Sequence, residues 1–436
     1  MKSIVPWTRP ATVSFKTVGC RLNQAETAAI RASFEEAGFI TVPFGRPCDV
    51  CVIHGCVVTA RAEEDGLRLA RGVQRRCPGA LVILAGCAAE LAAGAVSGGG
   101  AGLCLRRAPG GAAYLAGQGE KFNLPEILGM RFRPAAVKLS GLSPLFDTQR
   151  AIVKIQDGCD FRCSYCIVPR VRGPCRSRPA AEIIDEITKL TLRGFPEIIL
   201  TGVNIGCYAD GGCRLPQLLE KTEAVPSLRR FRISSLEITG VEREVIDFMA
   251  TSQKLCRFLH LPLQSGSDSV LKAMRRPYTS EDFSAVAQYA EKKLGDFGFG
   301  TDVIIGFPGE SEKDFRATEA MARDLPFNNL HVFSYSPRPG TPAASMPEQV
   351  SPCEKKQRAA LMIEIGRQKR NEFARSLVGK QLSLVAEKAQ NGRAEGWTGE
   401  YVRARVKTAS PRLKQIVRFT AEGAQNDLLL GVQSGE

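Results

Sequence analysis

The strongest constraint on the fold is a regular alternation of short apolar runs with helical patterns, which begins at residue 150 and continues to residue 334. The apolar runs predict strands at Ala151–Gln156, Glu197–Gly202, Arg230–Ser234, Arg257–Leu261, Gly300–Ile305 and Leu330–Ser334. Helical patterns lie between them, at Pro179–Arg193, Val241–Ser252, Ser280–Leu294 and Ser311–Arg323. Strands that alternate with helices form parallel sheets with right-handed crossovers. Residues 150–350 are therefore predicted to form a central, partial (β/α)6 barrel.

The first part of the chain repeats this alternation on a smaller scale. Strands are predicted at 11–17, Asp49–Ile53 and Leu81–Ala85, with helices at Asn23–Ala37 and Ala60–Arg76. This order is typical of a Rossmann-like parallel α/β domain, here assigned to residues 11–119. Residues 92–119 are rich in glycine and alanine and predict loose or irregular structure, and residues 120–149 are interpreted as a linker.

The last part of the chain changes pattern twice. The pattern of residues 351–376 predicts a helix with many basic side chains. Such side chains usually form a face that is exposed to solvent. Residues 377–436 consist of short alternating runs, which are typical of a small antiparallel β-barrel. The overall fold class is thus α/β with a C-terminal β-barrel.

The predicted β-barrel carries a candidate RNA-binding face. Arg403, Arg405 and Lys407 alternate along one strand and so share a face, with Trp397 and Tyr401 nearby. Basic side chains beside aromatic rings suit single-stranded or loop RNA, through phosphate contacts and stacking. A small structural cap without RNA contacts is the alternative.

A loop after the first strand of the central barrel contains three closely spaced cysteines. In GCDFRCSYCIVPRVRG, Cys159, Cys163 and Cys166 can direct three thiolates at one point. The next cysteine, Cys175, follows too late for ferredoxin-like spacing, so the loop predicts an iron–sulfur cluster with one iron left open for substrate or cofactor. A structural zinc site, which would need a fourth ligand, and plain buried thiols are the alternatives.

The predicted sheet topology indicates a second site that contains three cysteines. Cys20, Cys56 and Cys87 are each expected in the loop that follows one of the first three predicted strands. Because the carboxyl ends of parallel strands meet at one edge of a sheet, these thiols are expected to converge. Ordinary buried cysteines are the alternative, and that interpretation is kept for the remaining cysteines, including the CxxC pair Cys48 and Cys51.

Both cysteine groups resemble known motifs. The C-x3-C-x2-C spacing with Tyr165 before the third cysteine resembles the radical S-adenosylmethionine (SAM) superfamily. The segments KTVGCRLNQAET, VIHGCVVTARAEED and VILAGCAAE resemble the N-terminal domain of the methylthiotransferases, and the C-terminal barrel resembles their TRAM domain. One departure is His54-Gly55 before Cys56, where that family usually has Asn-Thr, so the hydrogen bonding of this loop is expected to differ.

The resemblance implies two [4Fe-4S] clusters, one held by Cys159, Cys163 and Cys166 and one by Cys20, Cys56 and Cys87. One SAM would donate a methyl group to a sulfur on the second cluster, and another SAM on the first cluster would yield the radical that abstracts hydrogen from C2 of an adenine. The substrate implied is N6-threonylcarbamoyladenosine in a tRNA anticodon stem-loop, a branch favoured by the wording ISSLE and HLPLQSGSDSVLKAMRRPY.

The resemblance also implies a set of SAM-binding residues at the carboxyl ends of the barrel strands, where active sites of such barrels lie. They are Tyr165, Gly202, Asn204, Glu237, Gln264, Asp302 and Gly306. Taken singly, each is a weak signal that turn chemistry also explains. His260, in the same position after its strand, is more often a hydrogen-bonded structural histidine than a catalyst.

Composition limits the class of partner. The formal net charge is +14 and the pI about 9.2, which favours a polyanion such as RNA, although a generally basic surface is the alternative. The opening residues MKSIVPWTRP have no apolar core, and no apolar run is long enough to predict a membrane span. Fifteen cysteines without a secretory signal indicate a reducing, cytoplasmic setting and metal ligation. Neither a membrane nor DNA is expected as a partner.

Three alternatives to this function stay open. Two lie inside the family: modification of isopentenyladenosine in tRNA, and modification of an aspartate in a ribosomal protein. The third is a non-enzymatic iron–sulfur RNA-binding protein. If the chain is a methylthiotransferase, it also needs an electron donor such as a flavodoxin or ferredoxin, and a sulfur source.

Overall fold

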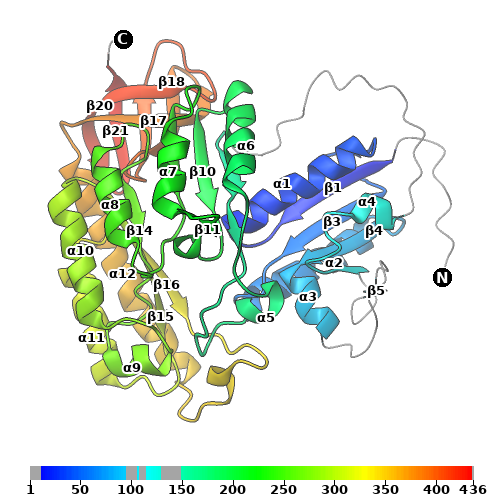
Figure 1. The fold of residues 1–436 in the computed structure, drawn as a ribbon, viewed down its shortest axis with the longest axis horizontal. Helices are drawn as coiled ribbons and strands as arrows, with labels where there is room; N and C mark the ends of the chain where they lie inside the picture. The colour runs from blue at the N-terminus through cyan, green and yellow to red at the C-terminus, as the bar shows by residue number, and fades with distance from the viewer. Residues whose placement is uncertain (1–10, 95–105, 108–113, 129–148, 435–436) are drawn as a thin grey trace. The chain divides into compact units, whose positions relative to one another are not determined.

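The computed structural model describes residues 11–94, 106–107, 114–128 and 149–434. The chain divides into two compact units. The N-terminal unit comprises Met1–Asp147, Cys166–Pro174 and Ser336–Gly340. The barrel unit comprises Thr148–Tyr165, Cys175–Tyr335 and Thr341–Glu436. Each unit has its own sheet system (Figure 1).

The N-terminal unit is built on one twisted sheet. Its elements are β1 (Thr12–Thr17), α1 (Arg21–Glu36), β2 (Ile40–Thr41), β3 (Val50–Gly55), α2 (Ala60–Arg76), β4 (Leu81–Gly86), α3 (Cys87–Gly94), β5 (Arg106–Arg107), β6 (Tyr114–Ala116), α4 (Leu124–Ile127) and α5 (Val168–Arg172). The strand order among the described residues is β2-β1-β3-β4-β6-β5, and all neighbours are parallel except β5 and β6. The predicted parallel α/β domain is confirmed.

Alternation along β3 gives this sheet two buried faces. Cys51 and Ile53 face a core that includes residues of α2 and α3, whereas Val50 and Val52 face a core shared with α1 and α4. Both faces are covered, so the strand is apolar throughout, as parallel strands of this kind are.

Three details of this unit differ from expectation. Cys87 is the first residue of α3, where a loop was predicted, although it still lies at the carboxyl end of β4. Within the region expected to be loose, β6 pairs in parallel with β4, because Leu115 supplies a buried apolar side chain to that face of the sheet. Within the expected linker, Leu124 and Leu128 are buried in the core beside α1. Much of both segments lies outside the described residues.

The barrel unit contains the strand–helix repeats predicted from the sequence. The repeat elements are β7 (Ala151–Lys154), α6 (Ala180–Leu192), β10 (Glu197–Thr201), α7 (Leu215–Glu223), β13 (Arg230–Ile233), α8 (Glu242–Thr251), β14 (Phe258–His260), α9 (Asp268–Ala273), α10 (Ser280–Leu294), β15 (Gly298–Ile305), α11 (Glu312–Asp324), β16 (Asn329–Ser334) and α12 (Pro352–Ser376). Short pieces join them: β8 (Gln156–Asp157), β9 (Arg176–Ser177), η1 (Ile205–Cys207), β11 (Ala209–Asp210), β12 (Cys213–Arg214) and η2 (Pro342–Ser345).

The six principal strands of these repeats form two parallel sheets, ordered β13-β10-β7 and β14-β15-β16. A parallel bridge between Phe231 and Leu255 joins the sheets where β13 meets β14. The strands thus follow one another in sequence order around a partial barrel, with helices outside (Figure 1). The side chains of Thr279 and Ser311 cap α10 and α11 and fix where these helices begin.

A closed five-stranded barrel follows α12. Its strands are β17 (Gln381–Gln390), β18 (Arg393–Thr398), β19 (Arg403–Lys407), β20 (Ile416–Gln425) and β21 (Leu428–Gln433), in the order β17-β18-β19-β21-β20. The barrel predicted from the sequence is confirmed, and its neighbours are antiparallel except β19 and β21, which are parallel. Phe419 fills its core, and Leu377 at the end of α12 packs into it.

Buried charges hold this C-terminal barrel against the strands of the partial barrel. Glu197 is fully buried and pairs with Arg230 at 2.5 Å and with Arg232 at 3.1 Å. Arg230 also donates to the carbonyl of Trp397, and Arg232 to that of Thr398. Burial alone would raise the pKa of Glu197, but the surrounding arginines hold that pKa well below its usual value. One carboxylate therefore anchors two domains within the barrel unit.

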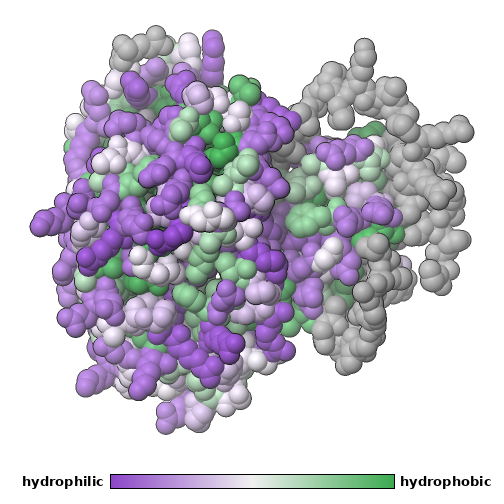
Figure 2. Space-filling view, viewed as in Figure 1, coloured by the Kyte–Doolittle hydropathy of each residue, from purple (hydrophilic) through white to green (hydrophobic). Residues whose placement is uncertain are grey.

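The surface of the barrel unit is polar. Hydrophilic side chains cover most of the face shown in Figure 2, and apolar ones are scattered among them. None of the helices that the structure describes combines the length and the apolar composition needed to span a bilayer.

Candidate active site

The first cysteine loop begins at the carboxyl end of β7 and is fixed by one buried glutamine. The side-chain amide of Gln156 donates to the carbonyl of Gly158 at 2.7 Å, and its oxygen accepts from the backbone N–H groups of Val203 and Asn204, both at 2.9 Å. The loop that carries the cysteines is thereby joined to the end of β10. The sequence analysis missed Gln156; its only signal was its place directly before the cysteine loop.

Cationic and amide groups surround the thiols of this loop. Arg276 donates to Sγ of Cys163 at 3.2 Å and lies over the ring of Phe161, 5.7 Å from its centroid. The Asn204 amide lies 4.0 Å from Sγ of Cys159. Burial raises the pKa of the Cys159 thiol, whereas the Phe161 N–H and the Asn204 amide lower it. A positive charge and N–H donors aimed at sulfur suit thiolates that hold an iron–sulfur cluster.

The strand ends beside the cysteine loop contain buried polar atoms without partners. Among the described residues, Oδ1 of Asn204 and Oγ of Ser234 have no hydrogen-bond partner. Such atoms are costly unless a ligand satisfies them. Their position at the carboxyl ends of β10 and β13, next to the cysteine loop, fits a bound polar cofactor such as SAM.

Glu237 lies near these atoms and contacts the Arg276 guanidinium directly. Burial raises the pKa of Glu237, and Arg276 opposes that rise. The pairing of Glu237 with Arg276 could not be read from the sequence, because the two residues come from different strand–helix units and meet only in the barrel.

Three other predicted SAM-binding residues have backbone roles in the structure. A Cβ at Gly202 would lie 2.8 Å from Oε1 of Gln156, and one at Gly306 would lie 2.1 Å from Cγ of Lys355, so both glycines permit close packing within the protein. Gln264 extends β14 by pairing with Val303. Tyr165 is partly buried against the core formed by Val270, Met274, Phe307, Tyr335 and Ala343.

The second group of cysteines lies at the carboxyl edge of the sheet in the N-terminal unit. Cys20 directly precedes α1, Cys56 follows β3, and Cys87 begins α3. Burial, with a smaller contribution from charges on Cys20 and Cys87, raises the pKa of the Cys56 thiol to about 11. The three cysteines thus lie at one edge of one sheet, as the topology predicts, and their shared cluster stays a prediction.

A buried charge network lies beside Cys87. Arg172 pairs with Glu26 through two contacts of 3.0 Å, and Lys121 pairs with the same carboxylate at 2.8 Å. Gln118 donates to Sγ of Cys87 at 3.3 Å. Burial raises the pKa of Cys87, whereas Arg172 and Lys121 lower it. Both cations thus favour the thiolate form of Cys87, which fits a thiolate-bound cluster.

The position of Arg172 in the chain adds a constraint. This residue follows Cys166 by six positions, so their Cα atoms are at most about 21 Å apart. The segment Cys166–Pro174, which contains the last cysteine of the first loop, is thus held in the N-terminal unit by a buried ion pair. Sequence analysis missed Arg172 and Lys121, because nothing in the sequence shows that they are buried together.

His54, the departure from the usual Asn, is fully buried. Its Nδ1 lies 3.0 Å from both Oγ1 of Thr27 and the carbonyl of Asn23. Burial lowers the pKa of His54 to about 3, so the ring is neutral at pH 7. The imidazole therefore joins β3 to α1 by neutral hydrogen bonds and leaves Cys56 in place.

Two protein-family models match the chain. Residues 153–322 match the Radical SAM superfamily, and residues 12–98 match Uncharacterized protein family UPF0004. The threonylcarbamoyladenosine tRNA methylthiotransferase MtaB of Bacillus subtilis (strain 168) is 33% identical over 94% of this chain and 93% of its own length. The chain belongs to the radical SAM methylthiotransferase family.

Other relatives agree with this assignment. The protein named threonylcarbamoyladenosine tRNA methylthiotransferase MtaB in Thermotoga maritima is 32% identical over 90% of each chain. The tRNA-2-methylthio-N(6)-dimethylallyladenosine synthase of Neorickettsia sennetsu is 30% identical over 94% of this chain and 90% of its own. In fold, the chain resembles the radical SAM methyltransferase TsrM from Kitasatospora setae, with a TM-score of 0.56, 13% identity and 77% of each chain covered.

Membership of this family makes the protein an enzyme of the transferase class and implies one [4Fe-4S] cluster and SAM. The thiols of the Cys159 loop and the unpaired polar atoms beside it fit that pair of cofactors. The match to residues 153–322 includes β10, β13, β14 and β15 in full and the second half of β7, and it ends before β16.

The enzyme has a second polar group inside its partial barrel. Nε2 of His260 and Nδ1 of His331 each lie 3.1 Å from Oδ1 of Asp302. Burial alone would raise the pKa of Asp302, but the two histidines hold that pKa well below its usual value. The carboxylate of Asp302, which the sequence predicts to bind SAM, thus contacts two imidazoles in the structure.

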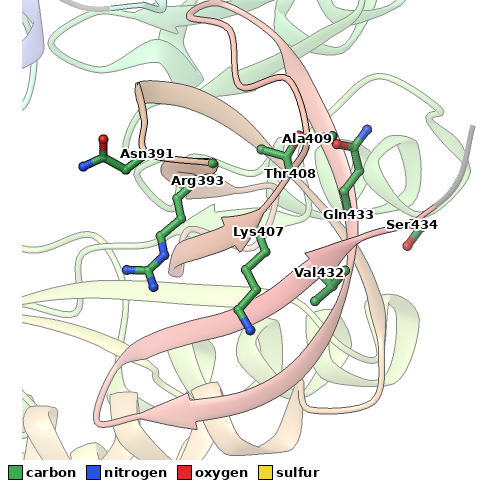
Figure 3. A pocket seen from close by; sticks show the side chains of 9 residues that line it. Asn391, Arg393, Lys407, Thr408, Ala409, Val432, Gln433 and Ser434 are labelled. Carbon is green, nitrogen blue, oxygen red and sulfur yellow. Dashed lines mark hydrogen bonds between the residues drawn. The ribbon is translucent and has the colours of Figure 1, made fainter.

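The three basic residues predicted to bind RNA share the outer face of β19, since Ala404 and Val406 between them are buried. Arg405 pairs with Glu395 at 2.5 Å, and Arg403 lies 3.9 Å from the same carboxylate. Lys407 lines a shallow groove of about 660 Å³ together with Arg393, a residue that sequence analysis missed. Figure 3 shows both side chains extending in the same direction from neighbouring strands.

The aromatic residues beside this face are used for packing. Tyr401 stacks on Trp397, with ring centroids 4.5 Å apart, and also contacts Phe258 at 4.7 Å. The guanidinium of Arg232 lies 5.0 Å from the centroid of the Tyr401 ring. Tyr401 therefore belongs to the contact between the C-terminal barrel and the partial barrel, and it is not presented as a stacking surface.

Proposed function

We propose that this enzyme is a tRNA methylthiotransferase that adds a methylthio group to C2 of N6-threonylcarbamoyladenosine beside the anticodon. The names of two relatives, with coverage of 90% or more of each chain, support a tRNA substrate and this branch. The relative from Neorickettsia sennetsu favours a second candidate, the isopentenyl (dimethylallyl) branch, and is matched over a similar length.

The observation that carries the methylthiotransferase function is the second group of thiols at the edge of the N-terminal sheet. A radical SAM enzyme that cleaves SAM needs only one cysteine loop. We propose that Cys20, Cys56 and Cys87 hold a second [4Fe-4S] cluster, and that Cys159, Cys163 and Cys166 hold the first. The cationic pair Arg172 and Lys121 supports the former assignment, since positive charge stabilises thiolate ligands.

When bound, SAM and the clusters supply a methyl group, a sulfur acceptor and the radical chemistry that an unactivated C2–H bond requires. The chain's own residues bind and orient. Asn204 and Ser234 are proposed to satisfy polar groups of SAM at the strand ends, with Glu237 positioned by Arg276. Gln156 joins the cysteine loop to the end of β10, and would thereby keep the cluster ligands beside the residues proposed to bind SAM.

The domain assignment that accompanies this proposal is a methylthiotransferase domain at residues 11–119, a radical SAM domain at 150–350, a connecting helix at 351–376 and a TRAM-like barrel at 377–436. A flavodoxin or ferredoxin as electron donor, a separate sulfur source and a cytoplasmic location complete the proposal. They are supported by the chemistry that the reaction needs.

Arg403, Arg405 and Lys407 are proposed to contact tRNA phosphates. Lys407→Ala should weaken binding of an anticodon stem-loop about equally for all sequences and reduce the slope of log K against log[salt] by about 1. Fluorescence anisotropy over a salt series measures this slope.

Arg403 and Arg405 share Glu395, so Glu395→Gln should strengthen binding at low salt. A wild-type affinity that hardly changes with salt would show that these cations are only solvated.

The test of the proposed substrate is nucleoside mass spectrometry of tRNA from cells that lack the gene. The methylthio-threonylcarbamoyl nucleoside should disappear and its precursor should accumulate, while the methylthio-isopentenyl nucleoside is unchanged. Complementation with the wild-type gene, but not with a Cys159→Ala variant, should restore it. An unchanged threonylcarbamoyl pool with a depleted methylthio-isopentenyl pool would favour the second candidate instead.

A further inference from the structure

The edge strand of the partial barrel presents unusual side chains to the interior. In β16, Leu330 packs toward α12, where it would meet a Cβ added at Gly366 at 3.0 Å. The alternating residues His331 and Phe333 must therefore point to the opposite face, which is the inside of the barrel. Both are exposed there, His331 at 46% of its side chain and Phe333 at 43%. A large exposed aromatic ring on an interior face indicates a place for a ligand.

Neighbouring strands add a charged group to this face. Asp302 of β15 pairs in register with His331, and His260 of β14 pairs with Gly300, two residues before Asp302. We call His260, Asp302 and His331 the lumen triad. His331 is exposed and the Asp302 side chain is 24% exposed, whereas His260 is buried. One member of the triad is thus buried, and the other two are open to solvent.

The buried member of the triad is incompletely satisfied. Nε2 of His260 lies 3.1 Å from Oδ1 of Asp302 but, among the described atoms, forms no aligned hydrogen bond. His331 contacts the same oxygen through Nδ1, so the ring is oriented by the carboxylate. Imidazole and carboxylate together offer hydrogen-bond acceptors and an N–H donor to anything that enters this side of the barrel.

We propose that the lumen triad binds the polar N6 substituent of the target adenosine, and that Phe333 stacks against its base. This inference rests on the proposed function and assigns its substrate specificity to particular residues. The ureido N–H and hydroxyl groups of a threonylcarbamoyl substituent can donate to Asp302, and its carboxylate can accept from His331. Phe333 lies two residues further along the same face, about 7 Å away, a spacing that suits a base next to its substituent.

The same arrangement disfavours an isopentenyl substituent. That group is a hydrocarbon with no donor or acceptor, so its entry would strip water from Asp302 and His331 and provide nothing in exchange. Sites that are built to hydrogen-bond a substrate reject analogues that lack the polar group far more strongly than apolar pockets reject an extra polar one. The triad would therefore select between the two tRNA branches by desolvation.

The experiment compares three anticodon stem-loop RNAs that differ only at the adenosine beside the anticodon: unmodified, threonylcarbamoylated and isopentenylated. Binding to the anaerobically reconstituted enzyme is measured by anisotropy. The wild-type enzyme should bind the threonylcarbamoylated RNA at least about 10-fold more tightly than the unmodified one. His331→Phe, which keeps a planar ring on an exposed position, should reduce this preference to about 2-fold or less and leave affinity for the unmodified RNA within about 2-fold. Asp302→Asn should reduce the preference in the same way.

Two controls separate specificity from folding and from general affinity. Iron content and the far-UV circular dichroism spectrum should be retained in His331→Phe, which shows that the barrel is intact. Lys407→Ala should weaken binding to all three RNAs by the same factor and keep the wild-type preference.

Each remaining outcome has one meaning. If the wild type prefers the threonylcarbamoyl RNA and both triad variants keep that preference, the inference is wrong while the proposed function stands. If the wild type prefers and methylthiolates the isopentenyl RNA, the proposed function itself is wrong. If the preference is lost with a chelator and restored by Zn²⁺, the triad is a metal site, and direct recognition of the substituent is overturned.

Discussion

Replacement of Cys20 by alanine is expected to halve the iron content of the reconstituted enzyme, from about eight to about four atoms per chain, because a three-thiolate site loses its cluster when one ligand is removed. SAM cleavage to 5′-deoxyadenosine should continue, since the loop at Cys159 is untouched. Methylthio product should fall below detection. Iron and sulfide analysis, together with chromatography of the nucleosides and of 5′-deoxyadenosine, measures all three quantities.

Matched cysteine variants make this result specific. Cys159→Ala should show the opposite pattern, in which about four irons remain but no 5′-deoxyadenosine forms. Cys353→Ala, at an exposed thiol on α12, should keep the full iron content and activity. A Cys20→Ala enzyme that still binds about eight irons would contradict the assignment of the second site.

Glu197→Gln is expected to destabilise the barrel unit strongly. It leaves Arg230 and Arg232 buried without their counter-ion, and breaking a buried ion pair in this way costs about 3–5 kcal/mol. Because the pKa of Glu197 is depressed in the folded state, its stabilisation is present at neutral pH and is lost as the pH falls below about 4. The variant should therefore lose less stability than the wild type on acidification.

Trp397 provides a local probe of this effect, because its carbonyl accepts from Arg230 at the domain contact. The chain has two tryptophans, so urea unfolding followed by fluorescence in a Trp7→Phe background reports on Trp397 alone. The control is Asp185→Asn, which removes an exposed ion pair with Lys189 and should shift the midpoint little. Equal midpoints for Glu197→Gln and Asp185→Asn would refute a structural role for the buried carboxylate.

The predicted strands and helices agree closely with the structure because periodicity is a local property. The helix predicted at Ser280–Leu294 has those bounds, and α2 spans Ala60–Arg76 as predicted. Cys87 shows the limit of this approach: a glycine before it indicated a loop, but the chain enters α3 at once. Likewise β6 was hidden in a Gly/Ala-rich segment, since a short strand that is bonded between β4 and β5 needs little intrinsic propensity.

The sequence by itself determined the strand–helix order, the C-terminal barrel, and the positions of both cysteine groups at the ends of strands, because these depend on local pattern and on the rules of parallel sheets. Only the tertiary structure decided which charges meet. Glu26 pairs with Arg172 and Lys121, Glu237 pairs with Arg276, and Asp302 contacts two histidines. In each case the partners are widely separated in the sequence. The sequence alone does not show whether a carboxylate binds a cofactor, an arginine or a histidine. The outcome depends on burial and on neighbours that only folding brings together.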